Sequence, residues 1–195
     1  MKKYKLGMIL GRFQIFHKGH ESIINKALEL CDEVIILIGS ADKYGTYENP
    51  FNYDTRRIII EEVYKDRVII APLNDLGVGN VPKWGDYVIE SCKKIKDVPD
   101  LVIYGDEDKC KEWYKNYPNI EYFKIDRGLI PTSSSDLKKM LTDNNYDEFK
   151  KYVNANILKY YSDMRLALIK ILYNKERAES NIDYSDLLDD VFDED

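Results

Sequence analysis

Short runs of β-branched and other apolar residues alternate with longer segments of helical period along most of this chain. The apolar runs predict five strands, at residues 5–10, 33–39, 67–73, 101–104 and 120–125. The segments between them predict helices at residues 20–31, 53–64, 84–95 and 107–117. Such alternation is typical of a parallel sheet with helices on its faces. With right-handed crossovers, these units predict an α/β protein with a doubly wound, parallel five-stranded sheet.

The loops that follow the predicted strands are where a ligand is expected. In a doubly wound sheet, ligands bind beyond the carboxyl ends of the strands, where the order of the strands reverses. The loops in question comprise residues 11–19, 39–52, 74–83, 105–107 and 126–134. Functional side chains are therefore expected in these five segments and at the starts of the helices that follow them.

The chain continues past the fifth predicted strand with more helical sequence. Ser133, Ser134 and Ser135 precede an apolar and basic run, as at a helix start. A further helix is predicted over residues 147–175. Its apolar stripe indicates core packing and leaves formation of a homo-oligomer open, and it consists of Ile157, Tyr161, Met164, Leu168 and Leu172. We expect one α/β domain over residues 1–145, a helical extension packed on it over residues 146–179, and an acidic, mobile tail over residues 180–195.

The acidity of the chain is concentrated in that tail. The 195 residues include 29 Lys and Arg against 35 Asp and Glu, a formal charge of −6. Residues 183–195 hold seven of the carboxylates and no basic residue, which leaves 29 basic against 28 acidic side chains in the rest of the chain. A nearly neutral body without a basic stripe argues against binding to nucleic acid or to a membrane surface. A local site for one small anion is compatible with this charge.

Other features predict a reduced, cytoplasmic protein. The apolar runs are far shorter than the roughly 20 residues needed to span a bilayer. The first residues lead into a strand without the apolar region of a signal peptide. Cys31, Cys92 and Cys110 are widely spaced, odd in number and form no C-x-x-C pair, so they are expected to be free thiols.

The most informative segment lies between the first predicted strand and the first predicted helix, at residues 11–20, GRFQIFHKGH. It contains the only two histidines of the chain, His17 and His20. A loop in this position presents backbone N–H groups and a helix N-terminus to an anion. Gly11 and Gly19 allow the backbone to approach that anion closely. The segment therefore predicts a phosphate site with both imidazoles beside it.

This segment resembles the G-R-F-x-P-x-H-x-G-H signature of the HxGH nucleotidyltransferase superfamily. More narrowly, the chain is similar to nicotinamide-nucleotide adenylyltransferases of the archaeal type and to the related domain of bacterial enzymes fused to a Nudix hydrolase. Further segments resemble motifs of that group: IGSA at residues 38–41, ENPF at 48–51, GDED at 105–108 and TSSSDLK at 132–138. The resemblance covers residues 5–145 and implies a Rossmann-like nucleotidyltransferase fold with C-terminal helices.

Two residues depart from the family pattern. Ile15 stands where the first signature has proline, which frees the φ angle of the loop but removes no ligand group. Lys138 stands where the second signature ends in arginine, so a point charge replaces a bidentate fork at the triphosphate. No Nudix box follows the nucleotidyltransferase motifs.

The reaction that the resemblance implies is attack of a mononucleotide 5′-phosphate on the α-phosphorus of ATP, with loss of pyrophosphate. For this chain it implies that NAD is made from nicotinamide mononucleotide, with Mg²⁺ held mainly by phosphates and water. The resemblance gives catalytic roles to His17, His20, Arg12 and Lys138. It gives contacts with ATP to Gly11, Phe13, Gly19, Gly105, Asp106, Ser133 and Ser134. It gives contacts with the mononucleotide to Gly39, Ser40, Asn49, Arg56 and Trp84, whose ring would stack on the pyridine.

Two alternatives remain open. The acceptor could be nicotinic acid mononucleotide or another phosphate, with ATP or CTP as the donor. Alternatively, the chain could be a non-catalytic nucleotide sensor that has kept the pocket and lost turnover. The substitutions at Ile15 and Lys138 favour a sensor, whereas the intact histidine pair favours an enzyme.

Overall fold

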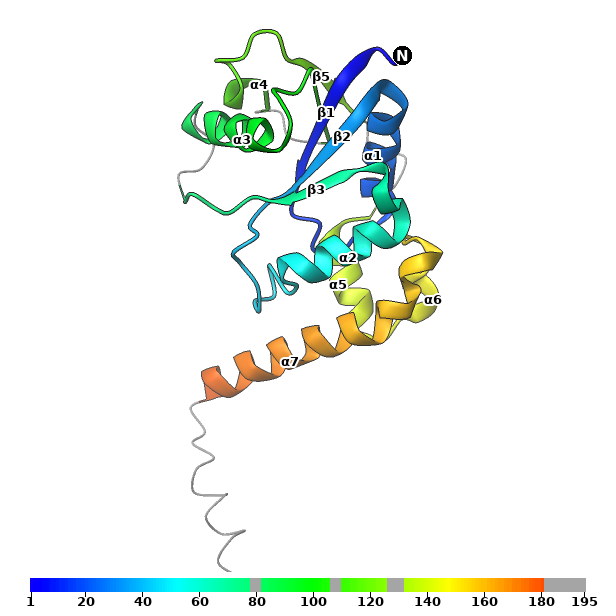
Figure 1. The fold of residues 1–195 in the computed structure, drawn as a ribbon. Helices are drawn as coiled ribbons and strands as arrows, with labels where there is room; N and C mark the ends of the chain where they lie inside the picture. The colour runs from blue at the N-terminus through cyan, green and yellow to red at the C-terminus, as the bar shows by residue number, and fades with distance from the viewer. Residues whose placement is uncertain (78–81, 106–109, 126–131, 181–195) are drawn as a thin grey trace, which may run out of the picture.

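The computed structural model describes residues 1–77, 82–105, 110–125 and 132–180. Its sheet has the strand order β3-β2-β1-β4-β5, and every neighbouring pair is parallel. The strands are β1 (Tyr4–Gly11), β2 (Cys31–Ile38), β3 (Ile69–Pro72), β4 (Leu101–Tyr104) and β5 (Glu121–Lys124). The predicted doubly wound, five-stranded parallel sheet is confirmed. The order reverses between β1 and β4, because the chain crosses from β3 at one edge back to the other side of β1 (Figure 1).

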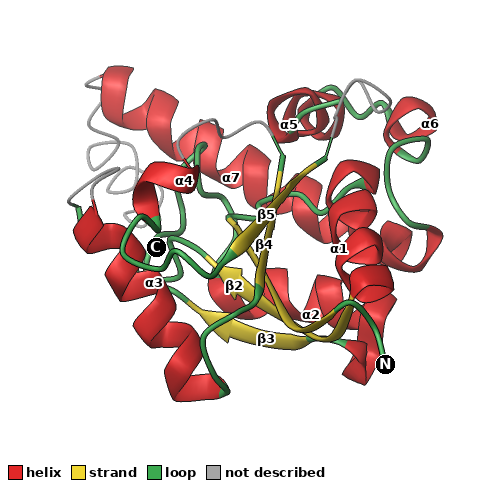
Figure 2. Cartoon of the chain, turned by 90° about the horizontal axis from the view of Figure 1, so that it is seen from above, coloured by secondary structure: helices red, strands yellow, loops and turns green. Residues whose placement is uncertain are grey.

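Helices cover both faces of the sheet (Figure 2). The helices between strands are α1 (Lys18–Leu30), α2 (Tyr53–Tyr64), α3 (Pro82–Ile95) and α4 (Cys110–Trp113), with a 3-10 turn η1 (Lys65–Arg67) before β3. The C-terminal helices are α5 (Ser134–Thr142), α6 (Tyr146–Phe149) and α7 (Tyr161–Ser180), with a 3-10 helix η3 (Ala155–Tyr160) before α7.

Alternate side chains of β1, β2 and β4 supply two separate cores. On one face, Ile9 and Ile36 pack with Ile24 of α1, Ile60 of α2 and Leu137 of α5. On the opposite face, the side chains of the neighbouring strand residues pack with α3 and α4, and this second core includes Met8, Ile35, Val102, Val88, Ile89 and Tyr114. Successive side chains of a strand point to opposite faces of the sheet, and both faces are buried here. These strands therefore appear in the sequence as continuous apolar runs.

The C-terminal region differs from the single helix predicted over residues 147–175. It divides into α6, η3 and α7, and asparagines account for two of the helix starts. Asn145 accepts a hydrogen bond from the N–H of Glu148, and Asn154 accepts one from the N–H of Asn156. Asparagine side chains compete in this way with continuous helical hydrogen bonding. The expectation of one uninterrupted helix was therefore wrong, although both ends of the segment are helical.

Four of the five residues of the predicted apolar stripe pack into the core, whereas Leu172 is half-buried and lies outside it. Ile157, Tyr161, Met164 and Leu168 are buried in the same core as α1, α2 and α5. Beyond them, α7 extends away from the body of the molecule (Figure 1). Tyr173 in this part of the helix is exposed, as is Leu166 before it. The expected tail, from residue 181 onward, lies outside the described residues. No described helix combines the length and apolar composition that crossing a membrane requires.

Candidate active site

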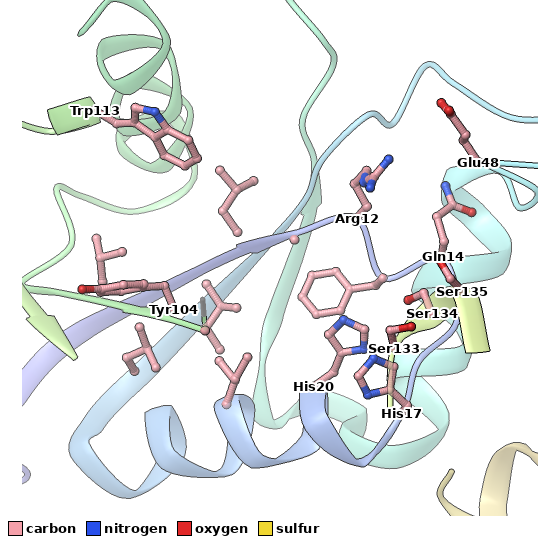
Figure 3. A pocket seen from close by; sticks show the side chains of 18 of the residues that line it. Arg12, Gln14, His17, His20, Glu48, Tyr104, Trp113, Ser133, Ser134 and Ser135 are labelled. Atoms are coloured by element: carbon pink, nitrogen blue, oxygen red, sulfur yellow. The ribbon is translucent and has the colours of Figure 1, made fainter. Parts of the chain in front are cut away.

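A cavity of about 350 Å³ lies at the carboxyl ends of β1 and β4, where the strand order reverses. Its walls come from segments far apart in sequence: the end of β1 and its loop, the first turn of α1, the end of β4, α4, and the first turn of α5. A crevice at this position is where doubly wound sheets bind their ligands. Figure 3 shows the two histidines beside Ser133 at one end of the cavity, with Tyr104 and Trp113 at the other.

The first turn of α1 fixes the ring of His17. His17 is the N-cap residue, and its Nδ1 accepts a hydrogen bond of 3.0 Å from the backbone N–H of Gly19. In a neutral imidazole the other nitrogen then carries the proton, so Nε2–H is a donor. A Cβ at Gly19 would lie 2.8 Å from the His17 ring, so a larger residue here would displace the ring. His17 is thus held as a hydrogen-bond donor at the edge of the cavity.

The ring of His20 is held by aromatic neighbours. Its centroid lies 3.9 Å from that of His17, 4.8 Å from that of Phe13 and 5.8 Å from that of Phe16. His20 is 9% exposed and His17 is 4% exposed. Phe13 adopts a left-handed φ of 49°, which is uncommon for a residue with a large side chain. The two imidazoles therefore line the cavity side by side in restricted orientations.

A second helix start faces the same cavity. Ser133 caps α5, and its hydroxyl accepts a hydrogen bond from the N–H of Asp136 while the Asp136 carboxylate accepts one from the N–H of Ser133. The Ser133 hydroxyl also donates to this carboxylate at 2.6 Å, and this hydrogen bond, together with the one from the Ser133 N–H, holds the pKa of Asp136 below its usual value. Ser134 and Ser135 also line the cavity, and their backbone N–H groups belong to the first turn, where the helix supplies no acceptor. The N-terminal ends of α1 and α5 thus border one cavity.

Two cations complete this end of the cavity. Arg12 is exposed at the rim, whereas Lys138 is 6% exposed. Lys138 Nζ donates to the carbonyl of Tyr47 at 2.7 Å and lies 4.8 Å from the centre of its ring. Burial, and then the charge of Arg12, lower the pKa of Lys138, while Glu48 opposes that shift. Positive charge is therefore gathered where two helix N-termini meet, which suits an anion with several charges.

The other residues expected to contact ATP are partly placed by the structure. Gly11, Phe13 and Gly105 line the cavity together with Ser133 and Ser134. Gly19 lies beneath the His17 ring rather than in the wall. Asp106 lies outside the described residues. The structure thus brings together segments that are more than 100 residues apart in the chain.

The five residues expected at the mononucleotide do not line this cavity. Asn49 adjoins it through Gln14, whose Nε2 donates to Asn49 Oδ1 at 3.2 Å and whose Oε1 accepts from the N–H of Phe51 at 3.0 Å. Gly39 and Ser40 follow β2, and the Ser40 hydroxyl donates to Asp75 at 3.1 Å. The loop after β2 is therefore attached to the loop after β1, next to the cavity.

Arg56 has a different environment from the one expected of a phosphate ligand. Its side chain is 1% exposed, and its guanidinium donates to four backbone carbonyls. A group that is buried and bonded in this way does not reach a ligand in this structure. The expectation that Arg56 contacts the mononucleotide directly has no geometric support.

Trp84 is half-buried on α3 and packs against Tyr87, with ring centroids 5.6 Å apart. The tryptophan that lines the cavity is Trp113, which is 7% exposed. The helices that carry them are in contact, because Gly85 of α3 lies so close to the Trp113 backbone that a Cβ would be 1.6 Å from the Trp113 carbonyl oxygen. Gly85 thus allows α3 and α4 to meet at the end of the cavity.

Several wall residues were given no individual role from the sequence: Gln14, Glu48, Tyr104, Trp113 and Ser135. Gln14 and Ser135 lie within motifs, so their position was a usable signal. Glu48 lies in a long loop whose course depends on its contacts with Lys138, and no sequence pattern indicates that contact.

The described residues contain no group of three His, Cys, Asp or Glu side chains able to hold a metal ion. Among the described wall residues, Glu48 is the one carboxylate. Mg²⁺ usually keeps several waters and takes one or two carboxylates together with phosphate oxygens. The wall therefore fits an ion that arrives with a polyphosphate.

The chain is similar to several known proteins. Residues 8–145 match the cytidylyltransferase-like family. A nicotinamide-nucleotide adenylyltransferase of Saccharolobus solfataricus is 40% identical over 88 residues, which are 42% of this chain and 50% of that protein. Another, from Methanococcus maripaludis, is 32% identical over 144 residues, which are 71% of this chain and 80% of that protein.

Among solved structures, a bifunctional NMN adenylyltransferase/ADP ribose pyrophosphatase from Francisella tularensis, complexed with AMP and a Mn ion, superimposes with a TM-score of 0.70. The sequences are 24% identical, and the match covers 90% of this chain and 54% of that one, so it shows a shared fold. The chain spans about half the length of the Saccharolobus and Francisella proteins.

Proposed function

Since the chain belongs to the cytidylyltransferase-like family, we propose that it transfers the adenylyl group of ATP to nicotinamide mononucleotide, forming NAD and pyrophosphate. The resemblance to archaeal nicotinamide-nucleotide adenylyltransferases that the motifs indicated is confirmed by the matches to two archaeal relatives. The observation that carries the proposal is the convergence of two helix N-termini, two histidines and two cations on one cavity at the reversal of strand order.

The proposed reaction is a single displacement at phosphorus. An oxygen of the mononucleotide 5′-phosphate attacks the α-phosphorus of ATP, the bond from that phosphorus to the bridging oxygen breaks, and pyrophosphate leaves with the electron pair. No covalent bond to the protein is needed. A transfer of this kind is catalysed mainly by alignment of the reactants and by stabilisation of charge on the phosphate oxygens.

We assign the charge stabilisation to the end of the cavity that holds the histidines. His17 would donate from Nε2, because its Nδ1 is occupied by the N–H of Gly19. His20, packed against His17, would contact a neighbouring phosphate oxygen. Removing one donor of this type from a transition state typically lowers turnover about 10²- to 10³-fold.

The start of α5 and the two cations would hold the leaving pyrophosphate. Backbone N–H groups at a helix N-terminus bind phosphate without a cationic side chain. Ser133, Ser134, Arg12 and Lys138 surround the space where the β- and γ-phosphates would lie. Mg²⁺, bound to the phosphates with Glu48 nearby, would neutralise part of their charge.

The mononucleotide would occupy the side of the cavity next to the loop after β2 and the start of α3. Asn49 is proposed as a polar contact whose amide is oriented by Gln14: since Nε2 of Gln14 donates to Asn49 Oδ1, the Asn49 Nδ2 group is the one free to donate to a ligand oxygen. Gly39, Ser40 and Trp84 are proposed to complete this side. Trp84 would stack on the pyridinium ring, which carries a positive charge.

The test is an acceptor and donor panel. Purified protein is incubated with Mg²⁺, with ATP or CTP, and with nicotinamide mononucleotide, nicotinic acid mononucleotide or an unrelated phosphate acceptor. Pyrophosphate release and product mass are followed, and NAD from ATP and nicotinamide mononucleotide is the expected product. Faster turnover with the acid form or with CTP would replace the proposed substrate, and nucleotide binding without turnover of any pair would indicate a sensor.

A further inference from the structure

Arg56 combines two properties that rarely occur together: its side chain is buried, and among the described residues it forms no ion pair. The guanidinium comes from the first turns of α2 and lies behind the wall of the cavity. Buried charges are normally paired, because an isolated ion loses its hydration. A cation kept here without a carboxylate therefore calls for a physical reason.

Its hydrogen bonds supply that reason. Nε donates to the carbonyl of Asn52 at 3.1 Å and Nη2 to that of Ser40 at 3.0 Å. Nη1 donates to the carbonyls of Arg12 at 2.7 Å and Gly39 at 2.8 Å. One planar group thus ties together the loop after β1, the loop after β2 and the start of α2. A lysine has a single donor atom and cannot reach the same four carbonyls in this fork geometry.

The carbonyls that Arg56 holds adjoin strained backbone. Ser40 has a φ of 47°, and the carbonyl of Arg12 belongs to the peptide that leads into Phe13, whose φ is 49°. Such conformations are energetically unfavourable for residues other than glycine and persist only where the surrounding structure enforces them. Phe13 in turn packs against the ring of His20 at 4.8 Å. A continuous path of contacts therefore leads from the Arg56 guanidinium to an imidazole of the cavity.

The charge of Arg56 is destabilised by its surroundings. Burial, and then the nearby charge of Arg12, lower the pKa of Arg56 to about 10, so the group stays protonated at neutral pH. The charge that lowers this pKa belongs to a second cation, Arg12, at the rim of the cavity. An anionic ligand in the cavity would relieve the repulsion between the two.

We propose that Arg56 is a positioning residue: it does not touch substrate, but locks the loops after β1 and β2 so that Phe13 and His20 are held in the geometry that the reaction needs. This inference rests on the proposed function for its kinetic consequences. Its structural consequence, the orientation of the histidines, can be measured without turnover.

The experiment compares the unaltered protein with Arg56→Lys and Arg56→Ala. Because His17 and His20 are the only histidines in the chain, the imidazole signals of an NMR spectrum report on the cavity alone. Thermal melting reports on folding, and kcat and KM are measured with ATP and nicotinamide mononucleotide. Arg57→Lys is the matched control, since Arg57 lies on the same helix but is bonded to Glu61 at its surface.

We expect both Arg56 variants to melt cooperatively, with the histidine signals shifted and kcat reduced at least about tenfold, while KM for ATP changes less than about threefold. Added guanidinium, at tens of millimolar, should enter the space left in Arg56→Ala, return the histidine signals toward their original positions and raise kcat several-fold. It should not do so in Arg57→Lys, whose properties stay unchanged.

A second variant tests the strained backbone. If Arg56 enforces the left-handed conformation at residue 40, Ser40→Gly should recover part of the lost activity in the Arg56→Lys background, because glycine adopts positive φ freely.

Unshifted histidine signals in a folded Arg56→Ala, or no response to guanidinium, would overturn the positioning role. Loss of cooperative folding in both Arg56 variants would also overturn it, by showing that the residue supports the whole fold. Absence of turnover in the unaltered protein would refute the proposed function alone, since the histidine signals would still decide the role of Arg56.

Discussion

His17 has two separable roles in this structure, and one pair of variants can distinguish them. Its Nδ1 caps α1 by accepting from the N–H of Gly19 at 3.0 Å, and its Nε2 is proposed to donate to a phosphate oxygen. The Oδ1 atom of asparagine is attached to Cγ, as Nδ1 of histidine is, so His17→Asn keeps an acceptor at the cap. It removes the donor at Nε2. His17→Ala removes both.

The magnitudes follow from these contacts. Loss of an N-cap costs about 1 kcal/mol of unfolding free energy, so His17→Ala should lower the melting temperature by about 2–4 °C. His17→Asn should melt within about 1 °C of the unaltered protein, since asparagine is a preferred cap. Turnover should fall about 10²- to 10³-fold in both, because both lack the Nε2 donor.

The assays are thermal melting and pyrophosphate release at saturating ATP and nicotinamide mononucleotide. Turnover of His17→Asn near that of the unaltered protein would refute the assignment of Nε2 as a donor to phosphate. A melting temperature of His17→Asn as low as that of His17→Ala would refute the cap geometry. The cap and the phosphate contact of His17 are therefore tested independently.

Three further predictions concern other parts of the structure. Gly85→Ala should lower the unfolding free energy by about 2 kcal/mol or more in a denaturation assay, because its Cβ would lie 1.6 Å from the Trp113 carbonyl oxygen. Gly39→Ala is the control, since its Cβ would lie 3.6 Å from the nearest atom and should have little steric cost. Lys138→Met should raise KM for ATP about tenfold through loss of a charge at the triphosphate, with a change in melting temperature of only a few degrees. Burial raises the pKa of Cys31 from 9.0 to about 11 and that of Cys92 from 9.0 to about 12, so the folded state keeps these protons longer than the unfolded state does. The stability that the two protonated thiols contribute is complete below pH 9 and is lost as the pH rises toward 12. At pH 10 the unfolding free energy should be lower by about 3 kcal/mol in total, as measured by denaturation at a series of pH values.

Each of these predictions has a clear contradiction. Equal stability of Gly85→Ala and the unaltered protein would mean that α3 and α4 do not meet as described. An unchanged KM in Lys138→Met would remove this lysine from the triphosphate site. A variant that carries alanine at both Cys31 and Cys92 serves as the control for the pH effect, since it should lose that much less stability between pH 8 and pH 10.

The sheet could be read from the sequence because its determinants are local. Strands buried on both faces need continuous apolar runs, and β2 and β4 are such runs, so their positions agree with the structure to within two residues. The prediction of one long C-terminal helix was wrong because an asparagine side chain can start a new helix by accepting from a nearby backbone N–H, instead of continuing the preceding helix. Asn145 and Asn154 have such partners, and periodicity alone does not reveal them.

The candidate site also combines features that the sequence predicts with features that depend on the tertiary structure. By itself, the sequence determined that a glycine-flanked loop with two histidines joins a strand to a helix, and that a serine cluster starts a later helix. Only the tertiary structure decided that α1 and α5 begin at one cavity, that Trp113 rather than Trp84 lines it, and that Arg56 is buried behind it. The physical reason is that capping and strand formation depend on neighbours in the chain, whereas burial and hydrogen-bond partners depend on which distant segments the fold brings into contact.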